Sequence, residues 1–308
     1  MKTLLKYLIK GILALLALLP LKVHYGLARF VAWLACSVLH YRTDDVMINF
    51  SRAFPEMNAY DFHDSGLKKR FYRHFANVIV ETIWFGGCHN PERLRRSGIV
   101  RIANPELLGS VSTSSPGVVV MYTHCGNWEL LGGLENYADP QDMSWVDEKN
   151  ICVVYREMSS RVWDEVMRDN RFAPLRDKSG FSGYVESKQL VRYAFSHKDD
   201  HTIFCINTDQ RPYFPGPGYT KVVFLHQECQ TMSAAASLAH KFGFAVLYQR
   251  MRENPDGRGY VIEYVPICPD GREMSVEAMM NRYYELLEAD IVEQPHNYLW
   301  THRRWVMI

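Results

Sequence analysis

Short, continuous apolar segments in the second half of the chain constrain the fold most. They read GVVVMY (117–122), ICVVY (151–155) and HTIFCIN (201–207), and they are rich in residues that favour strands. Helical segments accompany them, such as SAAASLAHKFG (233–243), which Gly243 closes. Because strands that are apolar on both faces must be covered on both faces, the sequence predicts an α/β fold with a central, mostly parallel or mixed sheet covered by helices.

A strand pair is expected near the carboxyl-terminal third of the chain. FAVLYQRMRE and GYVIEYVPI flank the turn sequence NPDGRG (254–259), which has the residues that favour a tight turn. We find no internal repeat, low-complexity tract or linker after the apolar amino terminus. Residues 41–308 are therefore expected to form a single domain.

The segment LKKRFYRHFANVIVETIW (67–84) predicts an amphipathic helix. Its expected apolar face holds Phe71, Phe75, Val78 and Ile79. Basic residues gather at its start, where they are suited to lipid headgroups or to an acidic carrier protein, although such a run is more often a solvated face. These are Lys68, Lys69, Arg70 and Arg73.

The amino terminus is apolar over residues 11–21 (GILALLALLPL) and again over 27–39. Each stretch is shorter than the roughly 20 residues that span a bilayer. A cleaved signal peptide is disfavoured because no A-x-A site follows Pro20. The lysines that precede the first stretch favour an uncleaved anchor or a shallow helical hairpin over residues 1–40, with a buried soluble helix as the alternative.

Composition excludes several classes of protein. The chain has 35 Lys and Arg against 34 Asp and Glu, so nothing predicts a nucleic-acid partner. Its seven cysteines are widely spaced among apolar residues, as reduced core thiols are. His197 and His201 are four residues apart but have no third ligand nearby in sequence, so we expect no metal and no bound cofactor.

The segment HCGNWE (124–129) directly follows the first predicted strand, at the sheet edge where α/β proteins usually bind their ligands. His124 and Glu129 would lie roughly 140° apart on one helix, so they meet only if Gly126 lets the chain turn between them. A neutral imidazole held by a carboxylate can remove a proton from a hydroxyl group. The pattern thus suggests a general base, although a His that only packs in the turn is the simpler explanation.

Other chemistries fit less well. The chain has no G-x-S-x-G nucleophile motif, the nearest string being residues 180–183, and no phosphate-binding G-x-x-x-x-G-K-[ST] loop. Cys125 is a candidate nucleophile, but neighbouring side chains in a turn tend to point apart. Asp209 follows the strand IFCIN and is expected at the same sheet edge as His124, or as a helix or turn cap.

Taken together, these residues resemble the late acyltransferases of lipid A biosynthesis, the lauroyl and myristoyl transferase family within the H-x4-D/E acyltransferases. The resemblance covers nearly the whole chain. It rests on the apolar amino terminus and on NFSRAFPE (49–56), HCGNWE (124–129), Tyr155-Arg156, Thr208-Asp209-Gln210 and YLWTHRRW (298–305). Where the family usually has Phe-Phe-Gly after the Asp-Gln motif, this chain has FLHQECQTM (224–232), which bears on the acyl or acceptor pocket.

The resemblance implies a glycerolphosphate-acyltransferase-like fold and a catalytic dyad of His124 and Glu129. It also implies supporting or substrate-binding roles for a further set, namely Asn127, Arg156, Asp209, Gln210, Arg303 and Arg304. The implied reaction moves a long acyl chain from acyl carrier protein or coenzyme A to a hydroxyl of a lipid A precursor, at the cytoplasmic face of the inner membrane. Another lysophospholipid or glycolipid acceptor, an acyl thioesterase and a non-catalytic membrane adaptor are the alternatives.

Overall fold

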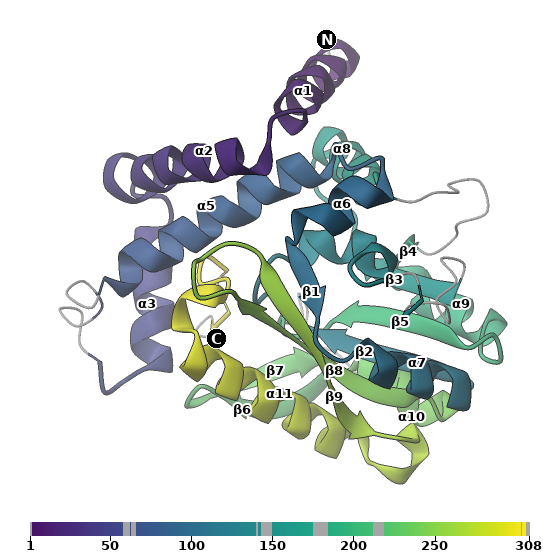
Figure 1. Ribbon diagram of the computed structural model, residues 1–308. Helices are drawn as coiled ribbons and strands as arrows, with labels where there is room; N and C mark the ends of the chain where they lie inside the picture. The colour runs from purple at the N-terminus through teal and green to yellow at the C-terminus, as the bar shows by residue number, and fades with distance from the viewer. Residues whose placement is uncertain are drawn as a thin grey trace.

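The computed structural model describes residues 2–57, 62, 66–139, 141–142, 150–174, 184–211, 219–302 and 304–305. A seven-stranded sheet in the order β1-β9-β8-β2-β5-β3-β4 forms its centre (Figure 1). Its strands are β1 (Val100–Ile102), β2 (Gly117–Tyr122), β3 (Ile151–Tyr155), β4 (Tyr184–Glu186), β5 (Thr202–Asn207), β8 (Ala245–Glu253) and β9 (Tyr260–Cys268). All neighbours pair in parallel except β8 and β9, which are antiparallel, so the sheet is mixed and mostly parallel as predicted.

Helices cover both faces of this sheet. The α-helices are α1 (Lys2–Ala17), α2 (Leu21–Trp33), α3 (Thr43–Ala53), α5 (Leu67–Phe85), α6 (Pro91–Ser97), α7 (Pro105–Ser114), α8 (Arg161–Arg171), α9 (Leu190–Ser196), α10 (Ala234–Phe242) and α11 (Val276–Glu293). A π-helix (Leu34–Val38) continues α2, and 3-10 helices span Trp128–Asn136, Ser187–Gln189, Gly271–Glu273 and Pro295–Asn297. A separate antiparallel hairpin joins β6 (Tyr219–Phe224) to β7 (Gln227–Met232).

The core is divided by the sheet, as continuous apolar strands require. Every residue of β2 is buried, and alternate side chains enter opposite layers. Val119 and Met121 pack with α10 and α11, whereas Val118 and Val120 pack with α6 and α7. The prediction of a sheet covered on both faces is therefore confirmed, and its physical basis is this alternation.

Helix α5 matches the predicted amphipathic helix except at one position. Phe71 and Val78 are buried, but Ile79 is 37% exposed, so its placement on the apolar face is wrong. Ile79 lies about 80° around the helix axis from Phe71, whereas Val78 lies within about 20° of it. Among the basic residues at the start of α5, Lys69, Arg70 and Arg73 are exposed.

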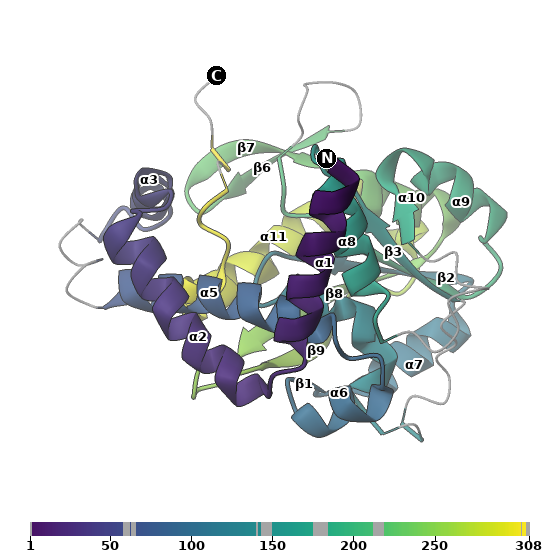
Figure 2. The same cartoon turned by 90° about the horizontal axis from the view of Figure 1, so that it is seen from above.

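The two amino-terminal helices are docked on the rest of the chain. Helix α2 runs alongside α5 (Figure 1), and α1 lies along α8 (Figure 2), where Lys6 pairs with Glu165 at 2.6 Å. Arg93 donates from Nη2 to the carbonyl oxygen of Ala17, at the end of α1. No described helix is by itself long and apolar enough to cross a membrane, but residues 6–17 and 21–38 qualify together as a pair bent by 118°.

Candidate active site

Sheet register brings His124 and Asp209 together. Strands β2 and β5 are adjacent and parallel, and Tyr122 pairs with Asn207 at their carboxyl ends. His124 and Asp209 each follow their strand's last residue by the same short interval, so they arrive level with each other. The Nδ1 atom of His124 lies 2.7 Å from Oδ1 of Asp209, and the backbone N–H of His124 donates to Oδ2 over 3.2 Å.

This contact defines the chemistry available to His124. A carboxylate at Nδ1 fixes the proton there, which leaves the Nε2 lone pair free to act as a base. Two amide groups face Nε2, that of Gln210 at 3.0 Å and that of Asn207 at 3.5 Å. Burial by itself would raise the pKa of Asp209, but the charge of His124 and its hydrogen bonds outweigh burial and lower it. Asp209 thus stays ionised beside the imidazole.

The segment that carries His124 turns sharply, as the sequence required. Gly126 has a φ of +70°, and an added Cβ would lie 2.6 Å from Cγ of Met251. The N–H of Gly126 donates to the backbone and side-chain oxygens of Asn297, both at 3.0 Å. The Trp128 ring then packs edge-on against His124, with centroids 4.6 Å apart. We refer to residues 124–129 as the His124 turn.

Glu129 is bound to an arginine in this arrangement. Its carboxylate accepts two hydrogen bonds from Arg171 of α8, over 2.7 and 2.8 Å. The pairing of Glu129 with His124 that the sequence suggested is therefore not the one present, because Asp209 occupies the Nδ1 side and Arg171 satisfies both oxygens of Glu129. Arg171 itself gave no signal in the sequence, since a bidentate pair between distant segments follows no spacing rule.

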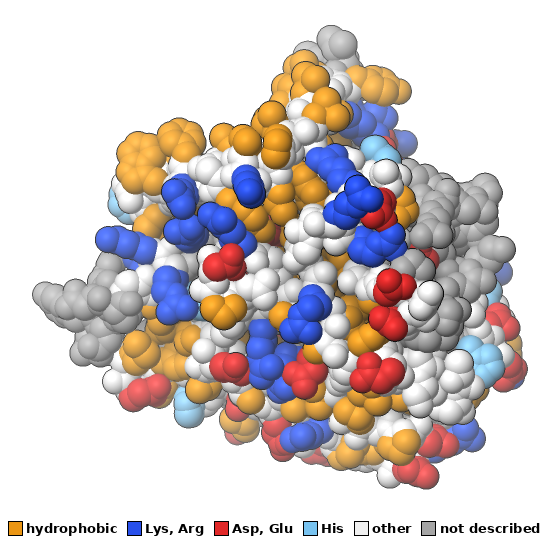
Figure 3. Space-filling model, viewed as in Figure 1, with side chains coloured by type: hydrophobic (Ala, Val, Ile, Leu, Met, Phe, Trp, Pro, Cys, Tyr) orange, Lys and Arg blue, Asp and Glu red, His pale blue; other side chains and the backbone are white. Residues whose placement is uncertain are grey.

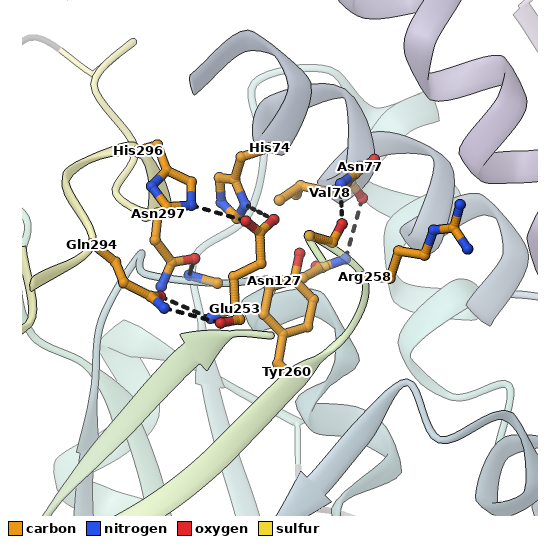
Figure 4. Close-up of polar contacts among 12 residues, drawn as sticks. His74, Asn77, Val78, Asn127, Glu253, Arg258, Tyr260, Gln294, His296 and Asn297 are labelled. Carbon is orange, nitrogen blue, oxygen red and sulfur yellow. Dashed lines mark hydrogen bonds and ion pairs between the residues drawn. The ribbon is translucent and has the colours of Figure 1, made fainter. Parts of the chain in front are cut away.

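Asn127 supports the His124 turn from within. Its side chain is fully buried, and its Nδ2 atom donates to the Val78 carbonyl (Figure 4). The same atom donates to the Glu81 carboxyl. Its Oδ1 atom accepts from the N–H of Glu129, which caps the following 3-10 helix. Because both polar atoms are engaged inside the protein, this geometry gives Asn127 a positioning role and not the substrate contact expected from the sequence.

The remaining predicted site residues divide by location. Arg156 is exposed and directly follows β3, whose Val153 pairs with Cys205 of β5, so it lies at the same sheet edge as His124. Arg303 lies outside the described residues. Arg304 is buried, donates to the Tyr284 hydroxyl over 2.9 Å, and stacks over the Phe224 ring. That position does not fit the substrate contact expected from the sequence.

A cysteine nucleophile is disfavoured by the same geometry. Cys125 is buried in the core layer that also contains α10 and α11, and burial raises the pKa of its thiol well above the ordinary value. A thiol held neutral is a poor nucleophile. Residues 180–183, the nearest approach to a serine hydrolase motif, lie outside the described part of the chain.

Two segments that the sequence analysis singled out, NFSRAFPE and YLWTHRRW, meet beside the site. Asn49, from NFSRAFPE, donates from Nδ2 to the carbonyl oxygens of Trp300 and His302, over 2.8 and 2.7 Å. Arg52 donates to the carbonyl of Trp305. His302 is close enough to His124 that burial first, and then the charge of His124, lower its pKa to about 4. NFSRAFPE thus holds the carboxyl-terminal segment in place.

Comparisons with known proteins identify related proteins. The family model for the bacterial lipid A biosynthesis acyltransferases matches residues 1–306. The lipid A biosynthesis lauroyltransferase of Escherichia coli (strain K12) is 23% identical over 303 residues, which cover 96% of this chain and 89% of that protein.

Proposed function

Because the chain belongs to the bacterial lipid A biosynthesis acyltransferase family, we propose that it transfers a long acyl chain from an acyl thioester to a hydroxyl of a lipid A precursor. The donor is acyl carrier protein or coenzyme A, and no further cofactor takes part. The observation that carries the proposal is the buried His124–Asp209 contact at the carboxyl edge of the sheet.

The reaction follows from the unprotonated Nε2 atom of His124, which the acceptor hydroxyl must reach in place of the amide that contacts it. Nε2 accepts the proton of the acceptor hydroxyl as the hydroxyl oxygen attacks the thioester carbonyl. The tetrahedral intermediate then collapses, the C–S bond breaks, and the imidazolium returns the proton to the leaving thiolate. Asp209 stabilises the imidazolium throughout. Gln210, whose amide lies 3.0 Å from Nε2, and Arg156, at the same edge, are placed to contact the substrates.

Glu129 contributes through its ion pair with Arg171 in this proposal. The pair fixes the guanidinium beside the His124 turn. A half-buried guanidinium held by one carboxylate is suited to a phosphate group or to the developing oxyanion. Removing Glu129 would therefore disturb the site without removing the carboxylate that holds His124.

The decisive test uses membranes of a strain that lacks the gene, supplied with full-length protein and lauroyl-acyl carrier protein. His124→Ala is expected to lower acyl transfer by about 10²-fold or more. His197→Ala is the matched control, because His197 also contacts an aspartate but lies at the opposite edge of the sheet. Undiminished transfer by His124→Ala would end the proposal, and free fatty acid released without an acceptor would favour a thioesterase.

The same proposal places the protein on the cytoplasmic face of the inner membrane, with residues 1–40 as its attachment and 41–308 as the acyltransferase domain. Apolar side chains project from the outer faces of α1 and α2, with basic groups below them (Figure 3). The exposed set includes Leu8, Ile12, Leu15, Leu18, Val23, Leu27, Phe30 and Trp33. Such a surface suits helices that lie in a lipid interface beside anionic headgroups.

Vesicle flotation tests the attachment. With vesicles that contain anionic lipid, the double variant Leu15→Glu, Phe30→Glu is expected to reduce the bound fraction about 10-fold or more, because each burial contributes roughly 1.5–3 kcal/mol. Phe195→Glu is the control, since Phe195 is equally exposed but lies on α9. Equal flotation of both variants and the wild type would refute this surface.

A further inference from the structure

A buried carboxyl group lies between helix α2 and the His124 turn, and the proposed reaction does not use it. Glu81 of α5 is fully buried. Its Oε1 atom accepts a hydrogen bond from the Tyr25 hydroxyl over 3.0 Å. Its Oε2 atom accepts from the Tyr260 hydroxyl over 2.9 Å and from Asn127 Nδ2 over 3.1 Å. Burying a carboxyl group is costly, so all three donors are needed to satisfy it.

On one side, Glu81 controls the His124 turn through Asn127. The Asn127 amide is also held by the Val78 carbonyl at 3.2 Å, and its Oδ1 atom accepts from Thr82 Oγ1 at 3.4 Å. The three partners of the Asn127 side chain, Glu81, Val78 and Thr82, all belong to α5. Figure 4 shows Asn127 and Tyr260 beside that helix. Asn127 is followed directly by Trp128, the ring that packs against His124. A shift of Asn127 would therefore move the wall of the imidazole site.

On the other side, Glu81 receives its first hydrogen bond from an amino-terminal helix. Tyr25 lies on the inner face of α2, is buried, and has the Arg258 guanidinium over its ring at 5.5 Å. The outer face of the same helix exposes Val23, Leu27 and Phe30. One helix thus presents an apolar surface outward and a hydroxyl donor inward to Glu81.

We infer that Glu81 and Tyr25 are positioning residues that join helix α2 to the His124 turn in one hydrogen-bonded unit. The amino-terminal segment is then part of the support of the active site as well as an attachment to lipid. This inference rests on the proposed function only in taking His124 as the reacting group. The chain of contacts from Tyr25 through Glu81 to Asn127 is independent of which lipid is acylated.

Hydrogen exchange on the full-length protein tests the coupling without reference to activity. In Tyr25→Phe and Glu81→Gln, amide exchange over residues 124–131 is expected to quicken about 3- to 10-fold, the range for one hydrogen bond. Exchange in the β6–β7 hairpin, which holds none of these residues, is expected to stay unchanged. Tyr264→Phe is the matched control, because Tyr264 is buried and its hydroxyl has no hydrogen-bond partner within the described chain.

Kinetics in detergent micelles, with lauroyl-acyl carrier protein as the donor, provide the second measurement. Both variants are expected to lower kcat about 3- to 10-fold with the donor KM and vesicle binding unchanged, and with any fall in Tm too small to unfold the enzyme at the assay temperature. Unchanged exchange over residues 124–131 would overturn the inference, as would a kcat loss that only follows a fall in Tm. If His124→Ala were fully active in the same assay, the proposed function would fail instead, and the exchange result would still stand.

Discussion

Replacing Asp209 by Asn tests the central contact of the proposed active site. Asp209 accepts two hydrogen bonds from one residue, from Nδ1 and from the backbone N–H of His124. An asparagine side chain has only one oxygen to offer. If its NH₂ group faces the backbone N–H, two donors oppose each other, and if it faces Nδ1, the ring must carry its proton on Nε2. The second outcome removes the lone pair that the reaction needs.

The size of the effect follows from these two losses. A buried hydrogen bond to a charged group contributes about 1.5–3 kcal/mol, or roughly 10- to 150-fold in rate if it is lost in the transition state. The wrong tautomer brings the total toward the full effect of a general base, about 10²- to 10⁴-fold in kcat. We therefore expect Asp209→Asn to lower kcat by at least about 10²-fold, with a smaller change in donor KM.

Purified enzyme in micelles, assayed for acyl transfer from lauroyl-acyl carrier protein, measures this directly. Asp200→Asn is the matched control, because Asp200 makes a 2.8 Å contact with Nδ1 of His197 in an exposed position. Glu129→Gln is the discriminating variant. A kcat near the wild-type value for Asp209→Asn, together with a collapse for Glu129→Gln, would refute the pairing and restore Glu129 as the partner of His124.

Three further outcomes are expected. Gly126→Ala should lower kcat about 10-fold or more, because the φ of Gly126 is positive and an added Cβ would meet Met251. Adding Met251→Ala should recover part of the loss. A fully active Gly126→Ala variant would contradict the turn geometry. Arg171→Met should lower kcat by at least about 10-fold. It would also leave the buried Glu129 carboxylate without its arginine, which denaturant unfolding should show as a fall of about 3–5 kcal/mol in the free energy of unfolding. Glu253→Gln should lower the free energy of unfolding by about 3 kcal/mol at pH 7. Burial alone would raise the pKa of the Glu253 carboxyl, but hydrogen bonds from two histidines lower it from 4.5 to about 2. The stabilisation that the ionised Glu253 contributes is therefore present above pH 4.5 and is lost as the pH falls toward 2. Denaturant unfolding of both proteins at pH 7 and pH 3 measures the difference between wild type and variant, and a variant as stable as the wild type at pH 7 would refute the prediction.

The layers of the fold could be predicted because the strands that are buried on both faces have continuously apolar sequences. The runs at β2, β3 and β5 are apolar at nearly every position, which only a sheet covered on both faces allows. The β8–β9 pair was predictable from its turn residues. Strand order was not, because nothing local states that β5 lies between β2 and β3.

That missing order explains the one misplaced pairing at the site. Sequence proximity favoured Glu129 as the partner of His124, since only a turn separates them. The partner in the structure is 85 residues away and arrives through the register of two parallel strands. Glu129 instead meets Arg171 of α8, a contact that depends on where a helix docks. Local patterns therefore identify which residues gather at a sheet edge, whereas register decides which of them touch.

Tertiary contacts also explain the sequence motifs that contain no candidate catalytic residue. Asn49 anchors the backbone of Trp300 and His302, and Asn297, just before them, holds the N–H of Gly126. The carboxyl-terminal segment is thus held by hydrogen bonds from α3 at residues 300 and 302, and at residue 297 it accepts a hydrogen bond from the His124 turn. Glu81 supports that turn at a second point, through Asn127. A base held between two such supports loses little conformational freedom on binding substrate, so residues remote from the chemistry can limit its rate.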